Sequence, residues 1–399
     1  MVRQAELRQQ LRPHGRVSFN CERCGFLRQC GGVEPATPLL DCFALCQIDH
    51  DCEPCQEVCP YNKSFAGRLK EVGGLRFDNL APITQRRAEL PTYVPVIQHW
   101  YKRSEPLRWP VVAIETYHIL RIVGRDYRAV VDSAEALRRL FMLAPDTQVI
   151  LLGTAKDSLL ERYWSYRRRD QAATQLARLG ILFAIGPNFS HFLDVPRTDN
   201  LFNRKRQLIC LTEFYHAGVS PVPHLSAVTP GDWRFWKDYL RSNDTIRLVA
   251  VEFQTGNKTK RQGLKVVERI AVLQDEVGRP LHPVIIGGSQ FVEAVAQYFP
   301  RFTLVDSRPF MCAVKRHSFD ESDSRVHWKQ NPTPPGAAID SLLTDNIARY
   351  AHWIESRRES SRPDNETNQK PVMLGRRFRT TRRRSGTHVA HGERRGDGP

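Results

Sequence analysis

The sequence predicts an α/β fold: a (β/α)8 TIM-barrel-like domain preceded by a small cysteine-rich metal-binding module. Short apolar runs such as 246–253 and 283–287 alternate with amphipathic helical stretches at intervals of roughly 20 to 40 residues, which is typical of βα units around a buried parallel sheet. Eight of the ten cysteines fall between Cys21 and Cys59. A doubly wound sheet is the alternative, because periodicity does not distinguish a closed sheet from an open one.

Composition narrows the class of protein. The 399 residues are enough for one large barrel and a small appendage, and the net charge of +16 favours a polyanionic partner, nucleic acid first. A solvated basic surface is the alternative explanation of that charge. The chain has no apolar run of about 18 residues and no apolar segment of the secretory kind near its start, so we expect no membrane span and a cytoplasmic location.

The amino-terminal third divides into an arm, a metal module and a linker. Residues 1–20 are polar, and residues 21–62 carry the clustered cysteines but few large apolar side chains, so a metal would have to stabilise the fold. The predicted ligands are Cys21, Cys24, Cys30, Cys42, Cys46, Cys52, Cys55 and Cys59. They suit two four-thiolate Zn²⁺ sites or a [4Fe-4S] cluster, since Cys52, Cys55, Cys59 and Pro60 have ferredoxin-like spacing. Residues 63–109, broken by prolines, indicate a linker packed on the barrel.

The barrel domain is predicted over residues 110–355. Its expected strands are 111–115, 148–153, 181–187, 222–227, 246–253, 283–287 and 302–306, with an eighth near 311–314. Its expected helices are 133–142, 156–178, 203–217, 232–241, 260–276 and 290–298, followed by a loop after residue 318 and a closing helix over 337–355. Residues 356–399 are basic and of low complexity, which predicts a disordered tail.

Polar residues follow the predicted strands, and parallel strands deliver such residues to one edge of a sheet. Acid–base or nucleophilic candidates are Asp306, Glu252 and His224, although Asp306 could instead cap a turn and His224 could be a core histidine. The predicted substrate-binding residues are Asn188, Ser190, Asp194, Arg197, Asn200, Gln254, Gly287, Gly288 and Arg308. Gly287 and Gly288 suit phosphate binding through backbone N–H groups, and the polar-aromatic loop 187–200 suits ligand orientation and base stacking.

Two resemblances add to these predictions. The runs GPNFSHFLDVPRTDN, PVPHLSAVTPGDW and LVAVEFQTG resemble an uncharacterised barrel family of bacteria, phages and mobile elements, which implies a barrel but no activity. The order VIIGGSQFVEAVAQYF and FTLVDSRPF is similar to the late barrel of tRNA-guanine transglycosylases. That resemblance implies Asp306 as a nucleophile acting on the glycosidic bond of an unpaired nucleotide.

Three functional hypotheses follow. The first is a nucleic-acid- or nucleotide-processing enzyme of mobile-element type, with base exchange or other glycosidic-bond chemistry at the carboxyl ends of the strands. The second is a non-catalytic, metal-stabilised nucleic-acid-binding or adaptor protein. The third is an iron–sulfur redox enzyme, which the cysteine spacing alone supports.

The metal prediction is tested by elemental analysis of anaerobically purified protein. We expect colourless protein carrying zinc, because the spacing from Cys46 to Cys52 departs from a standard ferredoxin run. A brown sample containing iron and acid-labile sulfide would instead establish the iron–sulfur alternative. Protein with neither metal would contradict both.

Overall fold

The computed structural model describes residues 68–361 apart from 69, 75–76, 193–196, 255–256, 258, 323–324 and 335. The predicted arm, the eight cysteines of the predicted metal module and nearly all of the predicted tail lie outside these residues. None of the helices in the described part is long and apolar enough to cross a membrane.

The described part is a mixed α/β fold with two four-stranded parallel sheets, as the sequence predicted at that level. The first sheet has the order β1 (Tyr93–Pro95), β10 (Thr303–Asp306), β9 (His282–Ile286) and β8 (Leu248–Glu252). The second has the order β2 (Val111–Glu115), β5 (Gln148–Leu152), β6 (Phe183–Ile185) and β7 (Pro221–Val222). Single parallel bridges pair Val96 with Ala113 and His224 with Ala250, so each edge of one sheet meets an edge of the other.

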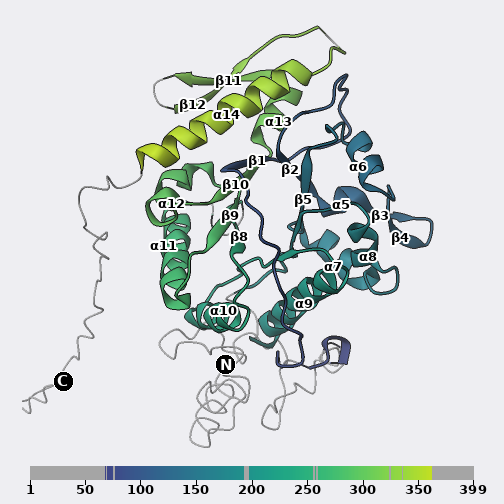
Figure 1. Cartoon of the computed structure of the whole chain (residues 1–399), viewed down its shortest axis with the longest axis vertical. Coiled ribbons are helices and arrows are strands. Elements are labelled where there is room, and N and C mark those ends of the chain that lie inside the picture. The colour runs from purple at the N-terminus through teal and green to yellow at the C-terminus, as the bar shows by residue number, and fades with distance from the viewer. Residues whose placement is uncertain are drawn as a thin grey trace, which may run out of the picture. The chain divides into compact units, whose positions relative to one another are not determined.

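Helices surround the strands in Figure 1. Their bounds are α5 (Thr116–Ile119), α6 (Ala134–Leu140), α7 (Asp157–Tyr166), α8 (Ala172–Ala177), α9 (Arg197–His216), α10 (Pro230–Ser242), α11 (Lys260–Val277), α12 (Val292–Tyr298), α13 (Arg308–Val314) and α14 (Asp340–Ser360). Local signals fix several of their ends. Thr229 and Asp232 form a capping box at the start of α10, and Gly278 ends α11 in the left-handed conformation.

Side chains alternate between the two faces of each strand and pack into two buried clusters. Val111 and Ala113 of β2 belong to one cluster, whereas Val112 and Ile114 of the same strand belong to another. The first cluster takes side chains from each of the eight parallel strands, and the second fills the space between strands and helices. Both faces of the sheets are therefore buried, which explains why the strands are near-continuous apolar runs in the sequence.

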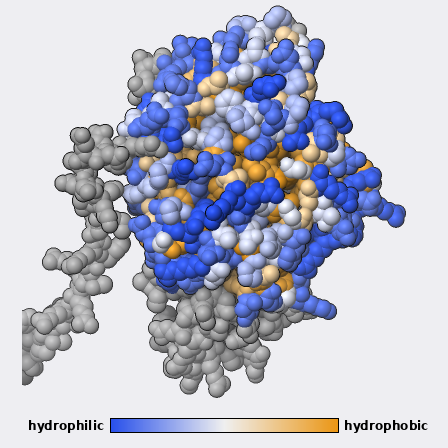
Figure 2. Space-filling model, in the orientation of Figure 1, coloured by the Kyte–Doolittle hydropathy of each residue, from blue (hydrophilic) through white to orange (hydrophobic). Residues whose placement is uncertain are grey.

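The segment before β1 covers the amino-terminal ends of the strands. Gln85 Nε2 donates to Pro221 O and Leu248 O, both at 3.0 Å, while Gln85 Oε1 accepts from Arg247 N at 2.9 Å and Leu248 N at 2.7 Å. The buried amide thus joins the starts of β7 and β8, which belong to different sheets. In Figure 1 this dark segment runs in front of the strands, and Figure 2 shows hydrophilic stretches beside hydrophobic surface on the same face.

Helix α9 is buried along a run of charged residues. Arg204 pairs with Asp232 at 2.8 Å, and both side chains are almost fully buried. The Lys205 ammonium donates to Asn79 Oδ1, and its burial lowers the pKa of the lysine to about 8. Arg206 pairs with Glu161 at 2.7 Å. Each cation has an internal partner, as burial of a charge requires.

Two regions differ from the sequence prediction. The predicted eighth strand near 311–314 is wrong, because these residues form α13; the eighth parallel strand is β1, within the segment interpreted as a linker. The predicted loop after Ser318 is also wrong in part, since β11 (His317–Ser322) and β12 (Arg325–Gln330) form an antiparallel hairpin. Phe319 N donates to the buried Asn346 side chain of α14, which anchors this hairpin.

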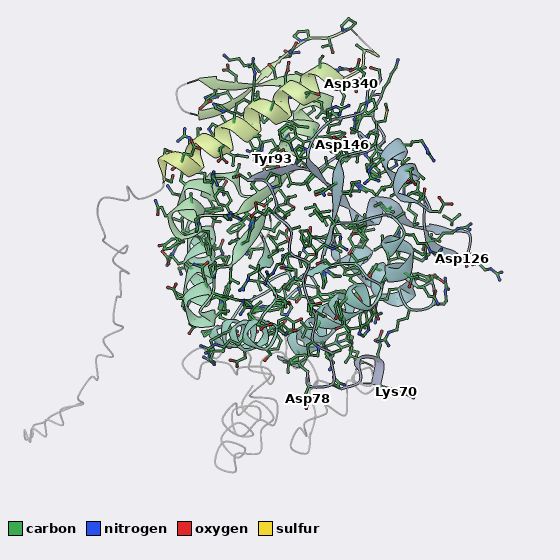
Figure 3. The ribbon with its side chains drawn as sticks, viewed as in Figure 1. Lys70, Asp78, Tyr93, Asp126, Asp146 and Asp340 are labelled. Atoms are coloured by element: carbon green, nitrogen blue, oxygen red, sulfur yellow. The ribbon has the colours of Figure 1, made fainter. Side chains whose placement is uncertain are left out.

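Two further differences lie after β2 and β5. An antiparallel hairpin of β3 (Leu120–Val123) and β4 (Asp126–Ala129) follows α5. The predicted helix 156–178 is split into α7 and α8 at Gln171, which has a positive φ of 48°. Helix α14 begins at Asp340, whose Oδ2 accepts hydrogen bonds from Ser104 N and Ser104 Oγ, both at 2.8 Å. Figure 3 labels Asp340 at the start of α14 and Asp126 at the tip of the β3–β4 hairpin.

Replacing Gln85 with alanine tests the contact between β7 and β8. The Gln85→Ala change removes the side-chain partner of three buried backbone groups and one partly buried group, so we expect the free energy of unfolding to fall by about 2–4 kcal/mol. Urea unfolding followed by circular dichroism measures it. The control Gln297→Ala, on the exposed face of α12, should change stability little, and equal stability of both variants would contradict the proposed contact.

Candidate functional site

A cavity of about 1310 Å³ opens at the carboxyl ends of the parallel strands. Each of the eight strands contributes a lining residue at or just after its end. These residues are Val96, Glu115, Thr154, Asn188, His224, Glu252, Ile286 and Ser307. The expectation that polar strand ends meet at one place therefore holds for Asn188, His224 and Glu252, and Ser190 and Gln254 line the same cavity.

Glu252 is held by an amide from the neighbouring sheet. Asn188 Nδ2 donates to Glu252 Oε2 at 2.7 Å, and Asn188 Oδ1 accepts from Ala155 N at 3.0 Å. Asn257 Nδ2 donates to Glu252 O at 3.1 Å. Because the bond from Ala155 fixes which way the Asn188 amide points, its N–H group is directed at the carboxylate. Glu252 is thus an oriented carboxylate that is partly exposed to the cavity.

His224 contributes a neutral imidazole to the cavity wall. Its side chain is 6% exposed, and burial lowers its pKa to about 4. Nδ1 lies 3.1 Å from Ser226 Oγ, and Nε2 has no hydrogen-bond partner among the described residues. Its backbone is held too, because Gln207 Nε2 donates to His224 O at 2.7 Å. Nε2 is itself buried, so the ring contributes to the cavity wall without presenting this nitrogen to the cavity.

The cavity also holds an acid–base pair of Glu115 and His118, of which the sequence did not reveal His118. His118 Nε2 lies 2.9 Å from Glu115 Oε2, and both residues line the cavity. Glu115 ends β2 and α5 begins at the next residue, so the two side chains are one helical turn apart. The signal that could have found the pair is Glu115-x-x-His118 at a strand end, since residues three apart on a helix face each other.

The cavity rim is aromatic and basic. Trp100 and Phe192 line it with exposures of 48% and 47%, and Arg121, Lys156 and Arg162 line it as well. Ser190 Oγ donates to Asp157 Oδ1 at 2.7 Å, which ties the Phe192 loop to the start of α7. Anions and planar rings are the ligand groups such a rim suits.

Asp306 lies outside the set of residues that line the cavity. Its Oδ1 accepts from Arg308 N at 2.8 Å and its Oδ2 accepts from Tyr350 Oη at 3.0 Å. The side chain is 7% exposed. These bonds connect β10 with α13 and α14, and they support the turn-capping interpretation of Asp306.

Backbone conformation accounts for the presence of glycine at the two positions that were predicted to bind phosphate. Gly287 N donates to Val305 O at 2.8 Å, so this N–H group belongs to the sheet. Its φ of +67° favours glycine, and a Cβ at this position would lie 2.7 Å from Gln254 Cγ. Gly288 also has a positive φ. Both glycines therefore have a structural reason that needs no ligand.

Two further predicted binding residues, Arg308 and Asn200, are not among the residues that line the cavity. Arg308 Nη1 lies 3.4 Å from Ser289 Oγ, outside the cavity lining. Asn200 is buried against the Phe192 backbone, and Arg197 begins α9. Asp194 lies outside the described residues.

Within the described ranges, no three or more His, Cys, Asp or Glu side chains are grouped so as to hold a metal ion. The predicted cysteine ligands lie outside these ranges, so the metal module stays a prediction.

The titration of His224 is tested by stability against pH. The folded-state pKa of about 4 lies below the unfolded value of about 6.5, so the unfolded chain takes up a proton first as the pH falls, and stability is lost from pH 6.5 downward. Between pH 6.5 and 5 this amounts to about 1.5 kcal/mol. Between pH 6.5 and 5, we expect the His224→Gln variant to lose about 1.5 kcal/mol less stability than the wild type, as measured by urea unfolding. An equal pH dependence in the two proteins would contradict the lowered pKa of His224. His282, with a pKa also near 4, remains in both proteins.

Comparison with known proteins gives no relative from which a function could be carried over. A scan against models of protein families found no match, and a search of curated proteins found none either. The cavity and its residues are therefore the basis for assigning a function.

Proposed function

We propose that the described part is a closed (β/α)8 barrel enzyme that acts on the glycosidic bond of a nucleotide in nucleic acid. Two observations support closure. Parallel bridges connect both edges of the two sheets, and one buried cluster takes side chains from all eight strands. A cavity at the carboxyl ends of the strands is where barrel enzymes hold their active sites.

The observation that carries the reaction is the Glu252 carboxylate, oriented by Asn188 in the same cavity as the separate Glu115–His118 pair. Glycosidic chemistry needs a carboxylate for the sugar and an acid for the departing base. In the proposed reaction, Glu252 attacks C1′ and forms a glycosyl ester. The C1′–N bond breaks, its electron pair moves to the base, and the base takes a proton from His118.

The second half returns the enzyme to its starting state. Water or an incoming base attacks C1′, and the ester bond to Glu252 breaks with its electrons returning to the carboxylate. The attacking group gives its proton to His118, whose Nε2 lies 2.9 Å from Glu115 Oε2. His224, whose pKa burial lowers to about 4, contributes a neutral ring to the wall of the same cavity.

The nucleic-acid partner is supported by the net charge and by the cavity rim. The sequence carries +16, and Arg121, Lys156 and Arg162 line the cavity that also holds the carboxylates. Such cations attract phosphates and make binding dependent on salt. The clustered cysteines, from Cys21 to Cys59, remain the predicted ligands of zinc or an iron–sulfur cluster that stabilises the amino-terminal module.

Replacing Glu252 with glutamine tests the reaction. Full-length protein is incubated with mixed-sequence RNA and DNA, and released bases are measured by mass spectrometry. Glutamine keeps the size of the side chain but is a poor nucleophile, so we expect base release to fall by roughly 10²- to 10⁴-fold with nucleic-acid affinity unchanged. The matched control is Glu268→Gln on the exposed face of α11, which should release bases at the wild-type rate.

Two outcomes would contradict the proposal. Wild-type rates in the Glu252→Gln variant would remove Glu252 from the reaction. Nucleic-acid binding by the wild-type protein without any base release would instead favour the non-catalytic binding protein.

A further inference from the structure

We propose that Trp100 and Phe192 form a stacking site for bases of an unpaired nucleic-acid strand on either side of the cavity entrance, with Arg121 placed for a phosphate. This inference rests on the proposed function and names its substrate class as single-stranded. It adds a binding site to the acid–base groups inside the cavity.

Trp100 is exposed but held in one orientation. Nearly half of its surface is exposed, yet its Nε1 donates to Gln98 Oε1 at 3.0 Å. The His118 ring contacts it at 4.5 Å between centroids, close to perpendicular, and the Arg121 guanidinium lies 5.2 Å from the ring centroid. A fixed indole needs little ordering when a base stacks on it, which favours binding.

Hydrogen bonds to its backbone hold Phe192 in place at the cavity entrance. Phe192 N donates to Asn200 Oδ1 at 3.0 Å, and Asn200 Nδ2 donates to Phe192 O at 2.7 Å. Asn200 is 2% exposed, so this pair of bonds is shielded from water. An amide that satisfies both backbone groups of one residue fixes the loop there, while Phe192 as a whole stays 47% exposed.

The two rings come from different sides of the entrance. Trp100 follows β1 and Phe192 follows β6, and β2 and β5 lie between these strands in the pairing order. The same cavity is also lined by His224, which is 6% exposed. A nucleotide can enter this cavity only when it has left its base stack, and its neighbours then need other surfaces to stack on. Exposed aromatic rings supply such surfaces without regard to sequence.

Charge at the rim fits the same ligand. Arg121 lies over Trp100, and Lys156 and Arg162 line the cavity together with Asp157. Phosphates of a strand that passes over the rim would meet these cations while its bases meet the rings. Flexible single strands permit this arrangement, whereas a duplex keeps its base faces covered.

The test measures binding of full-length variants to a fluorescently labelled single strand of mixed sequence, as DNA and as RNA, by anisotropy. About 0.3 M salt limits the contribution of non-specific phosphate contacts. We expect Trp100→Ala and Phe192→Ala each to weaken single-strand binding roughly 5- to 150-fold, the effect of losing one stacked base. Trp100→Phe should keep most of the affinity, and an unlabelled duplex should compete poorly.

Tyr101→Ala is the matched control, because Tyr101 is a neighbouring aromatic residue with 37% exposure that does not line the cavity. Its affinity should equal that of the wild type. Wild-type affinity in both Trp100→Ala and Phe192→Ala, or equal competition by duplex, would overturn the stacking site.

The reaction and the stacking site fail independently. Base release that survives Glu252→Gln, together with weak binding by Trp100→Ala, would reject the reaction and keep the stacking site. Base release that depends on Glu252, together with wild-type binding by Trp100→Ala and Phe192→Ala, would keep the reaction and reject the stacking site.

Discussion

The structure depends on burial of both faces of its parallel strands. Because side chains alternate along a strand, Val111 and Ala113 pack with their counterparts from the other strands, while Val112 and Ile114 pack under the helices. This packing fixes the register of every strand relative to its neighbours, since a shift by one residue would exchange the two faces. The residue that follows each strand is therefore placed at a common edge. Glu252, Asn188 and His224, far apart in the chain, meet there for this reason.

The sequence predicted strands correctly where the local apolar pattern was strong and missed them where the pattern was weak. The long apolar runs at β2, β5, β8 and β9 were recognised within a residue or two, because strands buried on both faces lack polar interruptions. The three-residue β1 was missed, since Pro91 and Pro95 indicate a linker and only its contact with β10 makes it a strand. Residues 311–314 were interpreted as a strand because four mainly apolar residues carry no period. The Tyr350 hydroxyl that donates to Asp306 comes from 44 positions away, which no local pattern reveals.

The cavity gives similar side chains different chemical characters. Glu252 accepts a hydrogen bond from the Asn188 amide, whereas Glu115 contacts the His118 imidazole, so the two carboxylates have different partners. The two imidazoles differ as well. The His118 ring lies beside the Glu115 carboxylate, while His224 loses its proton because burial penalises the charged ring and lowers its pKa. Such differences between like groups in one cavity are what acid–base catalysis requires.

The run Arg204–Lys205–Arg206 in α9 shows that a basic stretch of sequence need not form a basic surface. All three cations are buried: Arg204 pairs with Asp232 and Arg206 with Glu161, whereas Lys205 donates to the neutral amide of Asn79. The two ion pairs add nothing to the net charge of +16, because their carboxylates are counted with their guanidinium groups, and they contribute little to the potential around the protein. The cations that reach water around the cavity entrance, Lys156 and Arg162 among them, therefore shape the local potential more than this buried basic run does.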